Sequence, residues 1–159
     1  MTSTIGFVGK VSAINGVLAD DTTTIICLQK YNAIKKFNDN VLELIFPLYK
    51  SDGTTFQFTN SIFKSSSASQ KIILQIDILY KWLDVEYPPR FNFNLMINDN
   101  IYMSRNLGIS DEMDINNFIF NLIIDIKNND TIKFMFVTDF ENDNFIEIIS
   151  NSHIILKTF

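Results

Sequence analysis

The sequence predicts an all-β protein built as a sandwich or barrel, and three observations support this prediction. Hydrophobic residues make up 47% of the 159 positions, with 15 Phe but only 5 Gly and 3 Pro. In most apolar stretches, β-branched and aromatic residues alternate with polar ones, as they do on a pleated, half-buried surface. Clusters of turn-forming residues separate these stretches at intervals of about 8–12 residues, which is typical of an all-β domain.

The longest apolar region, residues 115–137, is expected to anchor the core. Two runs rich in Ile and Phe flank the polar tetrad 127–130, Lys-Asn-Asn-Asp. Asn and Asp suit a tight turn because they tolerate left-handed backbone, so the region is predicted to be a β-hairpin with a short loop. Each strand would present one apolar face: Phe118, Phe120, Leu122, Ile124 and Ile126 on the first, and Ile132, Phe134 and Phe136 on the second.

The first 36 residues allow two interpretations. Residues 11–18 contain Asn15-Gly16, a strong hairpin signal, and residues 22–28 have the composition of a strand. The alternative is an extended arm that docks on a neighbouring molecule, because chain termini are often loose unless something ties them down. We therefore divide a single-domain chain into residues 1–36, which are N-terminal strands or a docking arm, and residues 37–159, which are the sandwich domain.

Two strands are expected in the next part of the chain. Residues 41–49 form the first, and Pro47 places its far end at a sheet edge or a bend. Residues 51–53 are a turn, and residues 54–58 form the second strand. The serine-rich residues 65–69 are predicted to be a loop.

Residues 70–83 require a choice between strand and helix. Apolar residues occupy every second position from Ile72 to Trp82. A helix would carry apolar residues all round its axis, so a long strand is predicted, with a helix as the alternative. The remaining expected strands are 91–97, 101–103 after a turn at 98–100, 145–149, and 153–159.

Composition and charge disfavour several classes of function. The net charge is −5 and no basic patch stands out, so no nucleic-acid partner is expected. No segment resembles a signal peptide or reaches the length of a membrane span, so synthesis in the cytoplasm is expected. The single Cys27 is expected to be a buried structural thiol, because a thiol nucleophile needs a base and the one histidine, His153, is far away in the sequence.

From about residue 91 onward, the order of strands and turns resembles the tumour-necrosis-factor/complement-type jelly roll, or a related viral single jelly roll. The matching segments are residues 91–97, the turn at 98–100, the strand at 118–126 with its turn at Asn129-Asp130, the strand at 131–137, and a last strand with the small polar Ser152 near its start. Asn129 stands where the family usually has glycine. The resemblance implies a jelly-roll β-sandwich of about 8–10 antiparallel strands that forms a homotrimer around an aromatic axis.

Two acidic loops supply the candidate binding residues: Asp111, Glu112 and Asp114 in the first, and Asp139, Glu141 and Asp143 in the second. The second has the alternate spacing of a calcium loop, but it lacks that loop's glycine and its final glutamate, so a solvated turn is favoured. Paired carboxylates perform acid–base chemistry only in a cleft, and no neighbouring residue predicts one. Catalytic residues, metal ligands and cofactors are therefore not expected.

These observations predict a non-enzymatic structural or assembly protein. It would be a homotrimeric jelly roll in a virus particle or similar appendage, with itself and other virion or assembly proteins as partners. The alternative is a receptor- or glycan-binding module that uses loops of the same fold. Tyr80, Trp82 and Tyr87 could stack on a sugar, although core packing is favoured for Trp82. An enzyme is disfavoured because one His and one Cys offer little catalytic chemistry.

Overall fold

The computed structural model describes residues 22–83, 90–107, 115–139 and 145–159, and within these ranges the chain forms only strands, turns and loops. No helix in this part of the chain is long and apolar enough to cross a membrane. The predicted all-β class is confirmed. The strands are β1 (Thr24–Leu28), β2 (Ala33–Lys36), β3 (Val41–Glu43), β4 (Leu48–Asp52), β5 (Phe56–Thr59), β6 (Ile62–Ser65), β7 (Ser69–Leu83), β8 (Phe91–Ile97), β9 (Asn100–Asn106), β10 (Asn116–Lys127), β11 (Thr131–Thr138), β12 (Phe145–Ile148) and β13 (His153–Thr158).

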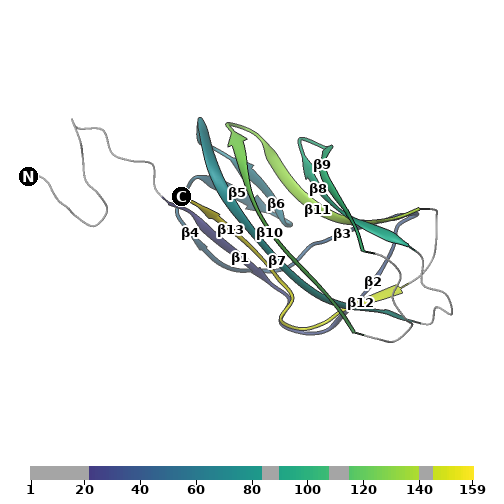
Figure 1. Ribbon diagram of the computed structural model, residues 1–159. Helices are drawn as coiled ribbons and strands as arrows, with labels where there is room; N and C mark the ends of the chain where they lie inside the picture. The colour runs from purple at the N-terminus through teal and green to yellow at the C-terminus, as the bar shows by residue number, and fades with distance from the viewer. Residues whose placement is uncertain (1–21, 84–89, 108–114, 140–144) are drawn as a thin grey trace, which may run out of the picture.

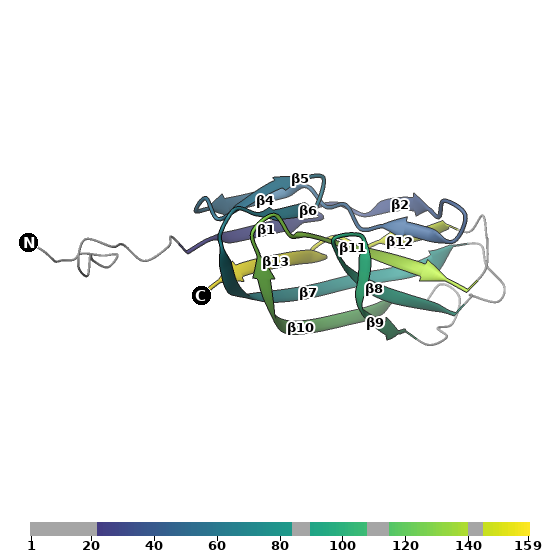
Figure 2. The same cartoon turned by 90° about the horizontal axis from the view of Figure 1, so that it is seen from above.

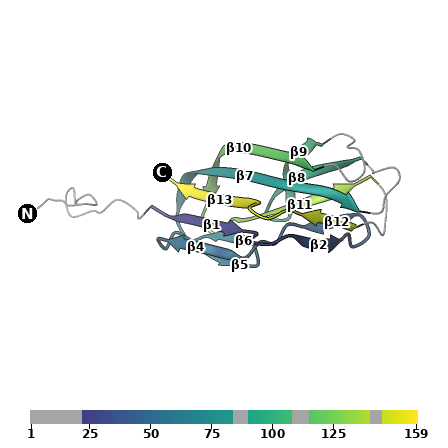
Figure 3. The same cartoon turned by 90° about the horizontal axis from the view of Figure 1, so that it is seen from below.

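The strands build two antiparallel sheets that stack as a sandwich (Figure 1). The 7-stranded sheet has the order β2-β12-β7-β13-β1-β4, with β10 also paired to β7. The 6-stranded sheet has the order β5-β6-β11-β8-β9, with β3 also paired to β11. Strands β2, β4 and β5 lie along one long side of the sandwich, and β9 and β10 lie along the opposite side (Figures 2 and 3).

The long strand β7 organises the 7-stranded sheet, which confirms the strand predicted at residues 70–83. β10 runs along one side of β7 in unbroken register, from Asn116 opposite Tyr80 to Lys127 opposite Ser69. On the other side, β13 pairs with residues 72–77 and β12 pairs with residues 80–83. One strand of 15 residues therefore holds three others in place.

The hairpin predicted at residues 115–137 is wrong. β10 pairs with β7, whereas β11 pairs with β8, β6 and β3 in the other sheet. The turn does form: the Asp130 N–H donates to the Lys127 carbonyl, and Asn129 has a φ of 68°. It carries the chain from one sheet to the other, so the apolar faces of β10 and β11 meet across the core instead of lying side by side.

The single strand predicted at residues 41–49 is also wrong. β3 belongs to the 6-stranded sheet and β4 to the 7-stranded sheet, and residues 44–47 cross between them. Pro47, which cannot donate to a sheet ladder, lies at the end of this crossing, and its carbonyl accepts from the Leu28 N–H. The short strand β6 was not predicted, and it ends where a loop was expected.

Residues 24–36 contribute two strands to the sandwich. β1 lies between β13 and β4, and β2 pairs with β12. The hairpin predicted around Asn15-Gly16 lies outside the described residues.

Aromatic side chains from both sheets fill the core. Phe93 of β8 lies 4.8 Å from Phe118 of β10, measured between ring centroids, and Phe91 of β8 lies 5.2 Å from Trp82 of β7. Edge-to-face and offset arrangements at such distances are favourable. Much of the Phe-rich composition is therefore core packing: Phe37, Phe46, Phe63, Phe91, Phe93, Phe134 and Phe136 are all nearly inaccessible to solvent.

Candidate functional site

Most of the predicted binding residues lie where the structure gives no description. Asp111, Glu112, Asp114, Glu141 and Asp143 fall outside the described residues, and so does Tyr87. Asp139 is described, and it is exposed just after β11. Within the described ranges, no group of three or more His, Cys, Asp or Glu side chains is placed to hold a metal ion.

Cys27 and His153 are closer in space than in sequence, but they lie on opposite faces of one sheet. Cys27 pairs with Ile154, and His153 pairs with Leu28 on the neighbouring strand. Cys27 points into the core with no exposed surface, whereas His153 faces outward with its Nδ1 2.9 Å from the Asn151 carbonyl oxygen. Burial raises the pKa of the Cys27 thiol to about 12, and a hydrogen bond with Ser61 offsets part of that rise. The two side chains cannot act as a nucleophile–base pair.

The proposed sugar platform does not form from the residues that are described. Tyr80 and Trp82 are 3% and 0% exposed and face the core from β7. Trp82 instead stacks on Phe37, with ring centroids 5.4 Å apart. These rings have no free face for a ligand.

The outer face of the 7-stranded sheet carries a set of aliphatic side chains in contact with solvent. On β10, Ile119 and Ile123 are 57% and 58% exposed, because they alternate with the core-facing Phe118, Phe120 and Ile124. Strand register places half-buried aliphatic residues of the neighbouring strands on the same outer face. We call this set the β10 face: Ile26 and Leu28 of β1, Ile73 and Leu79 of β7, Ile119 and Ile123 of β10, and Ile155 of β13.

Two pairs of polar groups flank the aliphatic side chains of the β10 face. The Lys71 ammonium lies 3.0 Å from the Asp125 carboxylate, and the Asn117 amide donates to Asp77 at 2.7 Å. Lys157 of β13 lies on the same outer face opposite Ile73, and it forms no salt bridge within the described residues.

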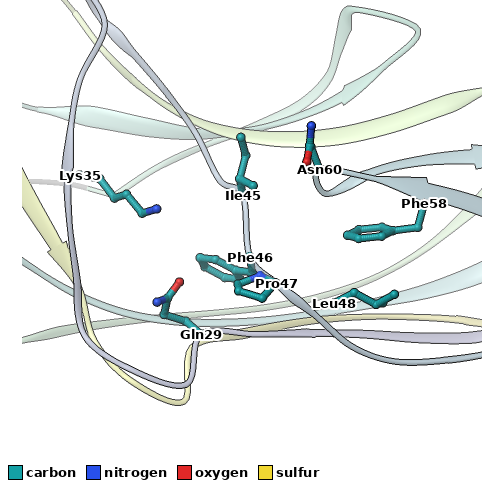
Figure 4. Close-up of a pocket in the computed structure, with 8 residues that line it drawn as sticks. All are labelled: Gln29, Lys35, Ile45, Phe46, Pro47, Leu48, Phe58 and Asn60. Carbon is teal, nitrogen blue, oxygen red and sulfur yellow. The ribbon is translucent and has the colours of Figure 1, made fainter.

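A groove opens on the long side of the sandwich opposite β10, between β2 and the crossing segment 44–47. Figure 4 shows Lys35 of β2 extending into this space from one wall, towards Ile45 and Asn60 on the other. Two adjoining hollows of about 330 and 370 Å³ share Lys35 and Ile45. We call the pair the Lys35 groove. Its lining is Gln29, Lys35, Ile45, Phe46, Pro47, Leu48, Phe58 and Asn60 in the first hollow, and Lys35, Lys36, Asn38, Val41, Leu42, Glu43 and Ile45 in the second.

Sequence reasoning missed this groove. It depends on β2 and β3 lying in different sheets, and hydrophobic periodicity does not report which sheet a strand joins. The one available signal was Pro47, which indicated an interruption in the apolar run 41–49.

The fold is a jelly roll that is similar to solved structures of tumour-necrosis-factor-type proteins. Murine APRIL matches with a TM-score of 0.59 at 10% identity, over 87% of this chain and 100% of that one. Eiger TNF from S. frugiperda matches with a TM-score of 0.56 at 10% identity, over 87% and 91% of the two chains. The vertex protein P5 of PRD1 gives a TM-score of 0.49 at 13% identity, over 87% and 96%.

Comparison of the sequence with protein-family models and with curated proteins finds no match. The jelly-roll fold expected from the order of strands and turns is thus confirmed from structure. At this level of identity the likeness establishes architecture, and function has to be argued from the surfaces of this chain.

Proposed function

We propose that the protein is a non-enzymatic structural protein that assembles as a homotrimer through the β10 face. The observation that carries this proposal is the exposure of Ile119 and Ile123, each more than half accessible, on the outer face of β10 at the edge of the 7-stranded sheet. Exposed apolar patches on soluble proteins mark interaction sites. A second copy is the favoured occupant because the β10 face presents seven aliphatic side chains in contact with solvent and because the resemblance to this type of jelly roll implies a trimer.

The outer surface of the strands that carry the β10 face supplies most of the area that one side of a single such contact needs. Each residue of a sheet covers about 3.3 Å by 4.8 Å, so the paired parts of β10, β7, β13 and β1 cover about 550 Å² in projection. Accessible surface exceeds projected area, and a standard interface takes about 800 Å² from each partner. The face is therefore large enough for most of one stable contact.

The mass of the purified protein by light scattering behind size exclusion tests the proposal. A homotrimer of 18.4 kDa chains has a mass of about 55 kDa. Ile123→Asp buries a charge in the interface and should reduce the assembly to monomer. Ile101→Asp is the matched control, since Ile101 is 61% exposed on β9 of the other sheet. A wild-type monomer at high concentration, or equal effects of the two substitutions, would reject the β10 face as the interface.

We place this trimer in a virus particle, as a capsid or other virion component, or in a similar appendage. Jelly rolls recur as capsid modules, and the described residues contain no catalytic constellation that would favour an enzyme. The role predicts that the protein sediments with assembled particles in fixed stoichiometry and stays attached in about 1 M salt, where exposed charge contacts are screened. If a source that contains particles yields the protein only in free form and none of it with the particles, this role is ruled out.

A binding module is the second candidate, because the Lys35 groove combines an apolar lining with Lys35 and Lys36, which form no salt bridge within the described residues. In this function the jelly roll would serve as a receptor-binding scaffold. The two acidic loops, which carry Asp111 to Asp114 and Asp139 to Asp143, lie largely outside the described residues. The Lys35 groove is therefore the surface that supports this alternative.

A further inference from the structure

We infer that the Lys35 groove binds an extended acidic peptide segment, which adds as a strand to the open edge of β2. This inference does not depend on trimer formation, since none of the residues that line the groove belongs to the β10 face. Three features of the groove carry it: its charge, its lining and the open edge of β2.

The groove carries positive charge that the described part of the chain does not neutralise. Lys35 lines both hollows and Lys36 lines the second, and neither forms a salt bridge within the described residues. Lys50, Lys71, Lys81 and Lys133 are ion-paired, whereas Lys36 has its ammonium 5.8 Å from the centroid of the Phe145 ring. Glu43 is the one carboxylate among the described lining residues, and it lies 3.9 Å from Lys133. In a chain of net charge −5, such a site selects for an anionic partner.

The lining is largely apolar, and two of its aliphatic side chains are exposed. Ile45 and Leu48 are 41% and 48% exposed in the lining itself. Tyr31, Ile34 and Tyr49 are also exposed in the same stretch of chain. Lys30 lies over the Tyr49 ring, 5.4 Å from its centroid. A ligand with both acidic and apolar side chains matches this combination better than a free inorganic anion does.

The walls of the groove offer backbone hydrogen-bonding groups. Within the described residues β2 pairs only with β12, so its other edge is open. β3 pairs with β11, and part of its other edge is already used, because Val41 exchanges backbone hydrogen bonds with Asn38. A strand paired on one side presents the N–H and C=O groups of alternate residues on the other. Extended peptides bind such edges by main-chain hydrogen bonds, and pockets for alternate side chains add selectivity. This geometry favours a peptide over an acidic glycan.

The test measures fluorescence anisotropy of labelled peptides about eight residues long, which span ~26 Å when extended. One alternates valine with glutamate, a second valine with glutamine, and a third valine with lysine. At an ionic strength of about 0.15 M, we expect the glutamate peptide to bind about tenfold more tightly than the glutamine peptide and the lysine peptide to bind least. Methylation of alternate backbone nitrogens in the glutamate peptide should abolish binding, because it removes main-chain donors.

Two substitutions in the chain localise the binding. Lys35→Glu and Ile45→Asp should each lower the affinity of the protein for the glutamate peptide by about tenfold. Lys64→Glu is the matched control, because Lys64 is exposed on β6 and does not line the groove. Its effect should stay within about twofold. Circular dichroism confirms that each variant is folded, and light scattering reports assembly separately.

Several results would overturn the inference. Equal binding of the three peptides, or equal effects of Lys35→Glu and Lys64→Glu, would remove the electrostatic argument. If the N-methylated peptide binds as tightly as the unmodified glutamate peptide, the peptide does not add as a strand to β2. If sialylated glycans bind and none of the peptides does, the groove binds an acidic glycan and the proposed peptide ligand is wrong.

Discussion

Replacing Ser152 by alanine should destabilise the protein by removing a hydrogen-bonding group from a gap in the central sheet. Along one side of β7, β13 stops opposite Asp77 and β12 starts opposite Tyr80. Ile78 and Leu79 therefore have no strand partner on that side. Ser152 is fully buried at this gap. Its Oγ accepts from the Leu79 N–H at 2.8 Å and donates to the Ile149 carbonyl at 2.8 Å.

The size of the effect follows from what the alanine leaves unpaired. In Ser152→Ala the Leu79 N–H loses its acceptor inside the fold, and a buried unsatisfied backbone donor costs ~1–3 kcal/mol. Taking about 2 kcal/mol, Tm should fall by about 4–8 °C, since a domain of this size loses about 2–4 °C per kcal/mol. Thermal and urea unfolding, followed by circular dichroism, measure the loss.

Ser150→Ala is the control for this prediction. Ser150 lies in the same turn, and its backbone N–H donates to the Asn32 side-chain oxygen at 2.8 Å. Alanine at this position keeps that bond, so the change in unfolding free energy should be within about 0.5 kcal/mol. If the two alanine variants lose equal stability, Ser152 is not the substitute for the missing strand partner and the account of the gap fails.

The remaining predictions concern Gly53 and Cys27. Gly53 has a φ of +89°, and an added Cβ would lie 2.6 Å from the Thr23 Oγ1. Gly53→Ala should therefore lower the free energy of unfolding in urea by at least about 2 kcal/mol. The neighbouring Thr54 is exposed, so Thr54→Ala should leave the free energy of unfolding nearly unchanged. Equal losses in the two variants would contradict the backbone argument. Burial raises the pKa of Cys27 from 9.0 to about 12, so the folded state retains a proton that the unfolded state releases, and stability should fall as pH rises from 9.0 towards 12. Cys27→Ala should show a shallower decline over this range, and identical pH slopes for the two proteins would refute the assignment.

The sequence predicted strands best where one face of a strand is buried along its whole length. In β7 the residues from Ile72 to Trp82 alternate strictly, and six buried side chains at period two leave no good helical arrangement. The turn at 98–100 was predictable for a related reason. Asn98 and Asp99 both adopt positive φ, at 54° and 63°, and Asn and Asp are suited to that backbone conformation in hairpin turns.

Sequence reasoning failed where the fold depends on which sheet a strand joins. Residues 127–130 have the composition of a hairpin turn, and a turn forms there, but a tight turn can also connect the two sheets of a sandwich. β10 has β7 as a partner for its full length, so the distant pairing determines the topology. The local pattern of Ile and Phe is the same in either arrangement. The Lys35 groove was missed for the same reason, since it exists only because the chain leaves β2 for the other sheet and returns at Pro47.

The positions of the two proposed surfaces make their functions separable. The exposed Ile119 and Ile123 lie on β10 at one long side of the sandwich, whereas β2 and β4, which contribute to the Lys35 groove, lie along the other long side (Figures 2 and 3). The two surfaces meet at Leu28 of the β10 face, whose N–H donates to the carbonyl of Pro47 in the groove lining. A trimer formed through the β10 face would keep three grooves open, so a multivalent acidic partner would bind it more tightly than a single chain does. Ile123→Asp should therefore leave the affinity for a monomeric glutamate peptide unchanged but lower the affinity for the same peptide presented on a dense surface. A loss of the monomeric affinity would mean that the groove is completed by a neighbouring copy.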